Sequence, residues 1–294
     1  MKRCLVIVAC VAAAAPLTAL AAPAASAPAA SAPVALEPDH VRAELVAETT
    51  ALVPGKRNWV GLRLRHEPHW HTYWINPGDS GLATKLTWQV PAAVEAGAVA
   101  WPAPQRFEVG GLFNFGYSGD IVLPVPLQVA ADAKIGTRVD LSVEAKWLVC
   151  REECMPGKAT LKLSLPVATD AATDSRVRRL FTTAHAAQPV AGAWSGEARL
   201  TGDRVVVTLS GENLPDADSL DALIVQRQVV GYAAPQIHAD DRRLILTFAK
   251  SEYLTETPVV LYLVVIEGHG PGIHARSVTV PFATSAVSAH PAHP

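Results

Sequence analysis

The sequence predicts an all-β fold: an immunoglobulin-like β-sandwich followed by a second, smaller β domain, with a short helix joining them. Apolar and polar residues alternate with period two in many short runs, which is the pattern of half-buried strands. Turn signals rich in glycine, proline and asparagine separate these runs. One segment between two groups of runs has helical periodicity instead, and a chain of 294 residues is long enough for two domains.

The N-terminus has the features of a signal peptide. Lys2 and Arg3 are positively charged, residues 5–20 are apolar, and residues 19–21 offer small side chains for cleavage. We therefore expect residues 1–22 to be removed on export and the mature protein to lie in the periplasm. Lipidation at Cys10 is the alternative, but the apolar stretch before it is very short.

Residues 23–35 are almost entirely alanine, proline and serine, so they cannot bury enough apolar surface to fold and are expected to form a tether. Beyond residue 22 no apolar run is long enough to span a bilayer, so the mature chain is expected to have no membrane span. The net charge is −2 and no basic stripe occurs, which argues against nucleic-acid binding.

The first domain is expected over residues 36–168. Its first strand begins where Val41, Ala43, Leu45 and Ala47 alternate with polar residues. Further runs follow at residues 60–64, 86–90, 121–129, 139–149 and 161–165. Turn signals between them suit antiparallel sheets that pack face to face.

Residues 169–188 are predicted to form a linker helix. Asp170 or Thr173 would cap it, and Val177, Leu180 and Phe181 would share one face. Strand patterns resume at residues 204–209, 222–226, 244–248, 259–266 and 277–282, which predicts the second β domain over residues 189–283. Residues 284–294 are expected to be a disordered tail.

Cysteines supply the most specific chemical signal. Cys4 and Cys10 would leave with the signal peptide, so the mature chain keeps Cys150 and Cys154. They lie where one long strand ends and the next begins, and their separation allows a disulfide across the hairpin end. A small ring at a loop end is open to thiol attack.

Three interpretations of this pair stay open. It can be a redox pair, a structural disulfide across a hairpin, or a copper(I) site completed by Met155. If it is a redox pair, Glu152 and Glu153 disfavour a thiolate and no helix N-terminus precedes either cysteine, so the pair is expected to be reducing rather than oxidising.

Two aromatic segments accompany the pair. Trp70, Tyr73 and Trp74 alternate with His69 and His71; we expect the tryptophans to be core residues, and the two histidines could share a face. Residues 101–117 carry aromatic side chains between glycines, which suits either a movable lid or an excursion at the edge of a sheet.

Several motifs in one order resemble the periplasmic N-terminal module of the DsbD and ScsB disulfide reductases. They are residues 76–82 (NPGDSGL), residues 101–107 (WPAPQRF) with Gly110-Gly111 and Gly116-Tyr117, residues 123–125 (LPV), and residues 147–150 (WLVC) with Cys154 and Pro156. The resemblance covers about residues 36–168 and implies an immunoglobulin-like fold. It also implies thiol-disulfide interchange without an organic cofactor.

The resemblance assigns roles to residues and partners. Cys154 would form the mixed disulfide and Cys150 would resolve it. A cap loop would shield the pair and would include Glu108, Leu112, Phe113 and Phe115, with Phe113 as the shielding side chain. Electrons would come from a thioredoxin-like donor and a membrane electron transporter, and would pass to a periplasmic disulfide isomerase or a cytochrome c maturation factor.

The sequence departs from this family in two ways. The DsbD module has a longer spacing between its cysteines, and full-length members continue into a membrane segment and a thioredoxin domain that do not follow here. We therefore expect a separately encoded transporter to supply the electrons. Because ScsB-type members are associated with copper tolerance, a copper-binding protein that uses Cys150, Cys154 and Met155 is the alternative function, and a scaffold with a structural disulfide is the third.

Overall fold

The computed structural model describes residues 34–36, 40–239, 242–268 and 273–283. The predicted signal peptide, the alternative lipid site at Cys10, most of the predicted tether and the predicted tail lie outside the described residues. Residues 34–36 form a short strand, β1, which pairs with a strand of the first domain.

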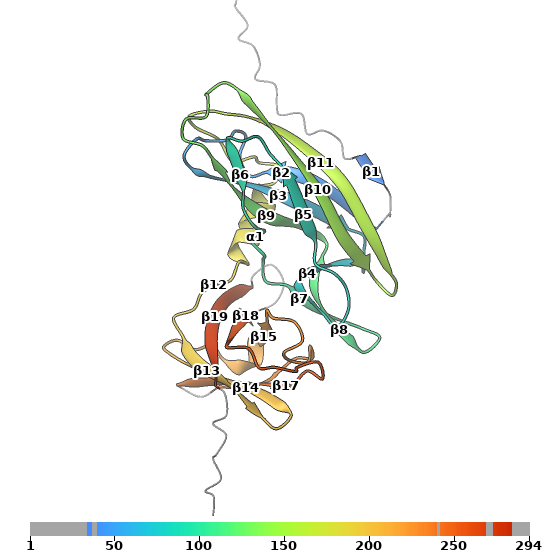
Figure 1. Ribbon diagram of the computed structural model, residues 1–294, viewed down its shortest axis with the longest axis vertical. Coiled ribbons are helices and arrows are strands. Elements are labelled where there is room, and N and C mark those ends of the chain that lie inside the picture. The colour runs from blue at the N-terminus through green and yellow to red at the C-terminus, as the bar shows by residue number, and fades with distance from the viewer. Residues whose placement is uncertain (1–33, 37–39, 240–241, 269–272, 284–294) are drawn as a thin grey trace, which may run out of the picture.

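The first domain is a sandwich of two antiparallel sheets (Figure 1). The larger sheet has the order β1 (Val34–Leu36), β11 (Cys154–Pro166), β10 (Arg138–Cys150), β4 (His71–Gly78), β8 (Leu112–Ser118) and β7 (Gln105–Val109), and β5 (Lys85–Gln89) also pairs with β10. The smaller sheet has the order β2 (Val41–Ala47), β3 (Arg57–His66), β9 (Asp120–Val129) and β6 (Val94–Ala96). All the strand runs predicted for this domain fall on these strands.

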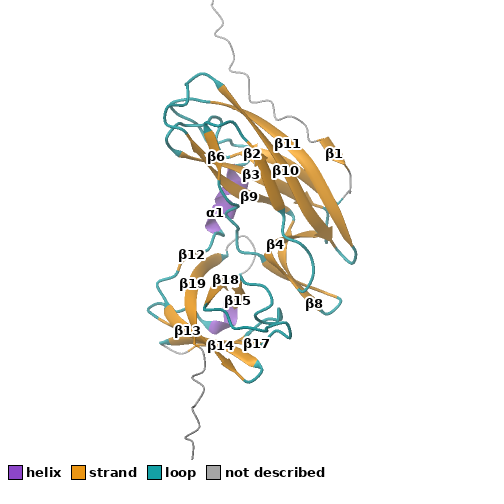
Figure 2. Ribbon diagram, in the orientation of Figure 1, coloured by secondary structure: helices purple, strands orange, loops and turns teal. Residues whose placement is uncertain are grey.

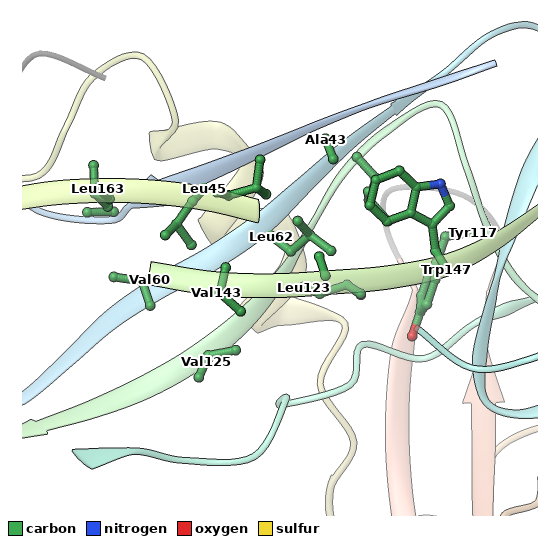
Figure 3. Packing of buried hydrophobic residues seen from close by; sticks show 14 of the residues in the cluster. Ala43, Leu45, Val60, Leu62, Tyr117, Leu123, Val125, Val143, Trp147 and Leu163 are labelled. Atoms are coloured by element: carbon green, nitrogen blue, oxygen red, sulfur yellow. The ribbon is translucent and has the colours of Figure 1, made fainter. Parts of the chain in front are cut away.

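The apolar side chains of the predicted alternating runs fill the space between the two sheets. Leu62 and Leu123 are fully buried, and Val143 of the larger sheet faces them across the core (Figure 3). Each such side chain contributes about 1.5–3 kcal/mol by leaving water. Trp70 and Trp74 are buried as predicted, so the tryptophans are core residues.

The helix α1 (Arg178–Ala186) is shorter than predicted and begins differently. Neither Asp170 nor Thr173 caps it, because the N-cap residue is Val177, which has no side-chain capping bond. Phe181 is fully buried with Val46 and Val122, and these two residues lie on strands of the smaller sheet. The helix is therefore packed onto the first sandwich as well as leading to the second domain (Figure 2).

The second domain draws its strands from residues 190–283 (Figure 1). Their order is β15 (Leu220–Ile224), β18 (Val260–Glu267), β19 (His274–Ala283), β13 (Ser195–Thr201), β14 (Arg204–Ser210), β17 (Arg243–Ala249) and β16 (Gln236–Ala239), and β12 (Val190–Ala191) also pairs with β19. A short 3-10 turn, η1 (Ala217–Ser219), precedes β15. The five predicted strands are present, whereas β12, β13 and β16 were not predicted. The all-β fold class is confirmed.

The two domains share apolar contacts. Leu223, Val264 and Ile266 of the second domain belong to the same buried cluster as the core of the first sandwich. In addition, Asn76 donates from Nδ2 to the carbonyl of Ile224 at 2.8 Å. Among the described residues, no helix has the length and apolar character needed to cross a membrane.

Candidate functional site

A disulfide joins Cys150 and Cys154 at the turn end of the β10–β11 hairpin. The two residues are register partners, and the Cα atoms are 4.2 Å apart with an S–S distance of 1.99 Å. They form the last pair of a long antiparallel ladder, and only residues 151–153 lie beyond them. Because the ladder positions both Cα atoms, the sequence of the turn has little part in bringing the sulfurs together.

The two cysteines differ in exposure. Cys150 is only 2% exposed, whereas Cys154 is exposed. Lys146 lies on the same face of β10 as Cys150 and is exposed, so the burial of Cys150 reflects a local cover over the hairpin end. A thiol entering from solvent would meet Cys154 first.

Strand β4 supplies two side chains beside the disulfide. His71 is the register partner of Cys150, and Tyr73 lies two residues further on the same face. The hydroxyl of Tyr73 is 3.5 Å from Sγ of Cys154, and since a disulfide sulfur has no proton, the tyrosine is the donor. The Tyr73 side chain is fully buried, and burial raises its pKa while a hydrogen bond with Ser80 opposes that rise.

A loop after β4, residues 78–82, covers Tyr73; we call it the cover loop. Gly81 has a φ of +92°, and a Cβ atom there would meet the Tyr73 ring at 2.2 Å, so glycine is required. Asp79 exchanges two hydrogen bonds with the backbone of Phe113, and Ser80 donates from N and Oγ to Oδ1 of Asn114. The cover loop is thereby fixed to β8.

The β7–β8 hairpin, residues 105–118, which we call the cap hairpin, contains the predicted cap loop. Cross-strand partners share a face, and Tyr73 pairs with Gly116 while Phe107 pairs with Asn114. Phe107 therefore lies on the face of His71 and Tyr73, and its ring stacks on His71 with centroids 4.6 Å apart.

The structure separates the four predicted cap residues. Glu108 and Phe113 are partners of each other and lie on the opposite face of the hairpin from Phe107. Phe115 is 2% exposed and contacts Trp74 in the core, so its ring does not face the disulfide. Leu112 is on the face of Phe107 at the hairpin tip and is 47% exposed.

His71 is an unpaired base next to the disulfide. It is 2% exposed, and its Nε2 atom is buried without a hydrogen-bond partner. Burial, with a smaller contribution from the nearby His66, lowers the pKa of His71 to about 4. The imidazole is therefore neutral near pH 7 and places no positive charge beside the sulfurs.

The charged residues of the turn point to solvent. Arg151, Glu152 and Glu153 are exposed, and the Arg151 guanidinium lies over the Trp70 ring at 5.5 Å. Within the described residues no thiolate-stabilising helix N-terminus adjoins the pair, since α1 packs on β9 at the smaller sheet.

The predicted copper ligands do not converge in this arrangement. Met155 packs against the hydrophobic core, whereas its neighbour Cys154 is exposed on the other face of β11. The described part of the chain contains no group of three or more His, Cys, Asp or Glu side chains that could hold a metal ion. His69 has a φ of +72° and precedes β4, so the alternation that would pair it with His71 does not extend to it.

Sequence reasoning did not predict the contacts of Tyr73, His71 and Phe107 with one another or with Cys154. Alternation alone placed His71 on one face of a strand, but the neighbouring strand was unknown. The signal that could have found Tyr73 is its position just before the NPGDSG turn, in which glycine at position 81 leaves room for a ring.

Comparison with known proteins matches residues 42–166 to the family described as "Thiol:disulfide interchange protein DsbD, N-terminal". Residues 42–166 are therefore similar to this family. The cysteine pair, the cover loop and the cap hairpin all fall within the matched residues.

One solved structure is similar over a longer part of the chain: the N-terminal periplasmic domain of ScsB from Proteus mirabilis, at 20% identity and a TM-score of 0.59. The match covers 83% of this chain and 94% of the ScsB chain, so the shared fold extends past residues 42–166 into the second β domain. No curated protein matches the sequence.

Proposed function

We propose that this protein is a periplasmic thiol-disulfide interchange protein whose reactive group is the Cys150–Cys154 pair. One observation carries the proposal: in a domain of this interchange family, the disulfide lies at a hairpin end with one sulfur buried and the other exposed. The predicted signal peptide supports the periplasmic location.

The exposed cysteine is proposed as the attacking residue. In the reduced protein the Cys154 thiolate attacks a partner disulfide, forms a mixed disulfide and releases one partner thiolate. The Cys150 thiolate then attacks Sγ of Cys154, which closes the Cys150–Cys154 disulfide and releases the second partner thiolate. Two electrons pass to the partner, the two released thiolates take up protons, and reversal of these steps by a donor dithiol regenerates the reduced pair.

The surroundings of the pair favour a reductant. A disulfide is strongly oxidising when its reduced thiolate is stabilised. Here His71 is neutral, the exposed turn carries two carboxylates, and the Arg151 guanidinium lies over Trp70. Among the described residues, the Tyr73 hydroxyl is the group whose hydrogen bond to Cys154 is seen, which supports only modest stabilisation of a thiolate.

The cap hairpin and the cover loop are proposed as a shield that opens for partners. Phe107 is the aromatic side chain that the strand register favours for this role, because it stacks on His71 beside Cys150. Phe113, which the family resemblance favours, stabilises the same cover through its backbone bonds to Asp79.

The proposed donor is a thioredoxin-like domain fed by a membrane electron transporter. The proposed acceptor is a periplasmic disulfide isomerase or a cytochrome c maturation factor. These partners rest on the family relationship of residues 42–166.

The experiment is an equilibrium reduction potential of the mature protein, measured by alkylation trapping in dithiothreitol redox buffers. A value of roughly −270 to −180 mV supports a relay, whereas a value below about −300 mV indicates a structural disulfide. A Cys150→Ser variant should also trap partners through Cys154, and a Cys154→Ser variant serves as its control; equal trapping by both would overturn the assignment of roles.

A further inference from the structure

One arginine of the cap hairpin binds the second domain. Arg106 on β7 forms a two-pronged ion pair with Asp221 of β15, with Nη2 to Oδ1 at 2.6 Å and Nε to Oδ2 at 3.1 Å. It also donates from Nη1 to the carbonyl of Tyr232. Its side chain is only 14% exposed, which makes this pair drier than most surface ion pairs.

Aromatic contacts lie beside the same residue. The Arg106 guanidinium lies over the Phe115 ring at 4.8 Å, and Phe115 contacts the Tyr232 ring edge to face. Asn76, at the end of β4, donates to the carbonyl of Ile224 on β15. Three neighbouring strands of the larger sheet, β4, β8 and β7, thus contact the second domain.

The alternation of β7 links these contacts to the disulfide. Arg106 and Phe107 are consecutive residues of one strand, so their side chains point to opposite faces. Arg106 points to the second domain, while Phe107 stacks on His71, the register partner of Cys150. Because β7 is an edge strand held on one side only by β8, its position depends on the contacts of its two faces.

We propose that the second β domain is the positioning element of the cap, and that Arg106, held by Asp221 and Tyr232, keeps Phe107 over His71 and so limits access to the disulfide. Arg106 is a positioning residue, since it contacts neither sulfur. A role of this contact in electron transfer rests on the proposed function. Its effect on access to the disulfide can be measured without any partner protein.

The test is the rate at which dithiothreitol reduces the disulfide of the full mature chain. Arg106→Asp and Asp221→Arg should each make reduction about three- to tenfold faster, because the cap loses its anchor. The double variant, which restores an opposite-charge pair, should return toward the native rate. Hydrogen exchange of residues 105–118 should rise and recover in the same order.

A matched control is Arg63→Ala. Arg63 makes an equally two-pronged ion pair with Asp120, within the smaller sheet of the first sandwich. Its loss should change stability without changing the reduction rate. If a charge reversal fails to fold, Arg106→Lys keeps the charge, loses the fork and should give an intermediate rate.

Two results would overturn the proposal: an unchanged reduction rate in folded Arg106 variants, or the same acceleration in Arg63→Ala. The failure of the proposed function is a different result, because a potential typical of a structural disulfide would leave these rates measurable and their ranking intact.

Discussion

At the scale of single residues, one hydroxyl lies beside Cys154 and one neutral imidazole lies on the register partner of Cys150. The Tyr73 hydroxyl is within 3.5 Å of the exposed sulfur, and the His71 ring meets the Tyr73 ring edge to face with centroids 5.2 Å apart. Both side chains are buried, so water does not occupy their positions beside the disulfide. Each therefore allows a specific prediction.

Replacing Tyr73 with phenylalanine should slow the reaction of the reduced protein with iodoacetamide at neutral pH by about two- to tenfold, because a hydrogen bond to the thiolate contributes about 0.5–1.5 kcal/mol. The measurement is the alkylation rate of Cys154 as a function of pH. Tyr262→Phe is the control, since this tyrosine is half exposed in the second domain. An unchanged pH profile in Tyr73→Phe would show that the hydroxyl does not act on the thiolate.

His71 should make the fold sensitive to mild acid. Its pKa falls from 6.5 to about 4 on folding, so between these values the unfolded chain binds a proton that the folded protein does not. Its contribution to stability is complete above pH 6.5 and is lost as the pH falls toward 4. His66, whose pKa is also lowered by burial, acts in the same direction.

The check is urea unfolding at pH 7 and pH 4.5. The loss of unfolding free energy between the two pH values should be smaller in His71→Phe, which keeps an aromatic ring against Phe107, than in the native protein. His238→Gln, at an exposed position, should behave like the native protein. An equal loss in all three proteins would contradict the role given to His71.

At the scale of elements, the cap hairpin is a ribbon with two different faces. Phe107→Ala should increase the rate of alkylation of the reduced protein by several fold, because it uncovers His71 and the cysteine beside it. Phe113→Ala is the matched comparison, since the same ring is removed from the opposite face of the same hairpin. The reverse ranking would favour the side chain that the family resemblance implies.

The same hairpin shows how far sequence reasoning reaches. Alternation located the strands because the period of two is a local property, and it placed Leu62 and Val143 in the core correctly. The backbone of Phe113, in the aromatic loop that the resemblance implies as a cap, is bonded to Asp79 of the cover loop, and the shielding role of this loop stays a prediction.

The pairing register of the strands could not be predicted from local sequence patterns. Whether Phe107 or Phe113 lies on the face of His71 depends on which residues of β4, β8 and β7 are partners, and a shift by one residue reverses the answer. The cap of α1 was missed for a related reason: Phe181 is held by burial against Val122, so tertiary packing stabilises this helix without a capping side chain.

At the scale of the whole molecule, part of the second domain's apolar surface is buried in the core cluster of the first sandwich. Leu223 of β15 is 1% exposed and packs in the cluster that fills the first sandwich. Leu223→Ala should lower the free energy of unfolding by about 2–5 kcal/mol and raise hydrogen exchange in strands of both domains. Leu246→Ala should cost a similar amount, with the effect concentrated in the second domain, to whose core it belongs. Identical exchange maps for the two variants would show that the shared cluster does not couple the domains.

The hairpin that carries the disulfide also suggests how relatives of this protein are to be searched for. The indole of Trp147 covers Gly157, its register partner, so closely that a Cβ atom at residue 157 would lie 2.2 Å from Nε1. Both residues stand three positions outside a cysteine, on the ladder side, whereas residues 151–153 lie beyond the last pair. Insertions between the cysteines would lengthen a solvent-facing turn, while a change at Trp147 or Gly157 would disturb the ladder itself. The lasting signature of the site over evolutionary time is thus expected to be the tryptophan and the glycine that flank the cysteines, rather than the number of residues between them.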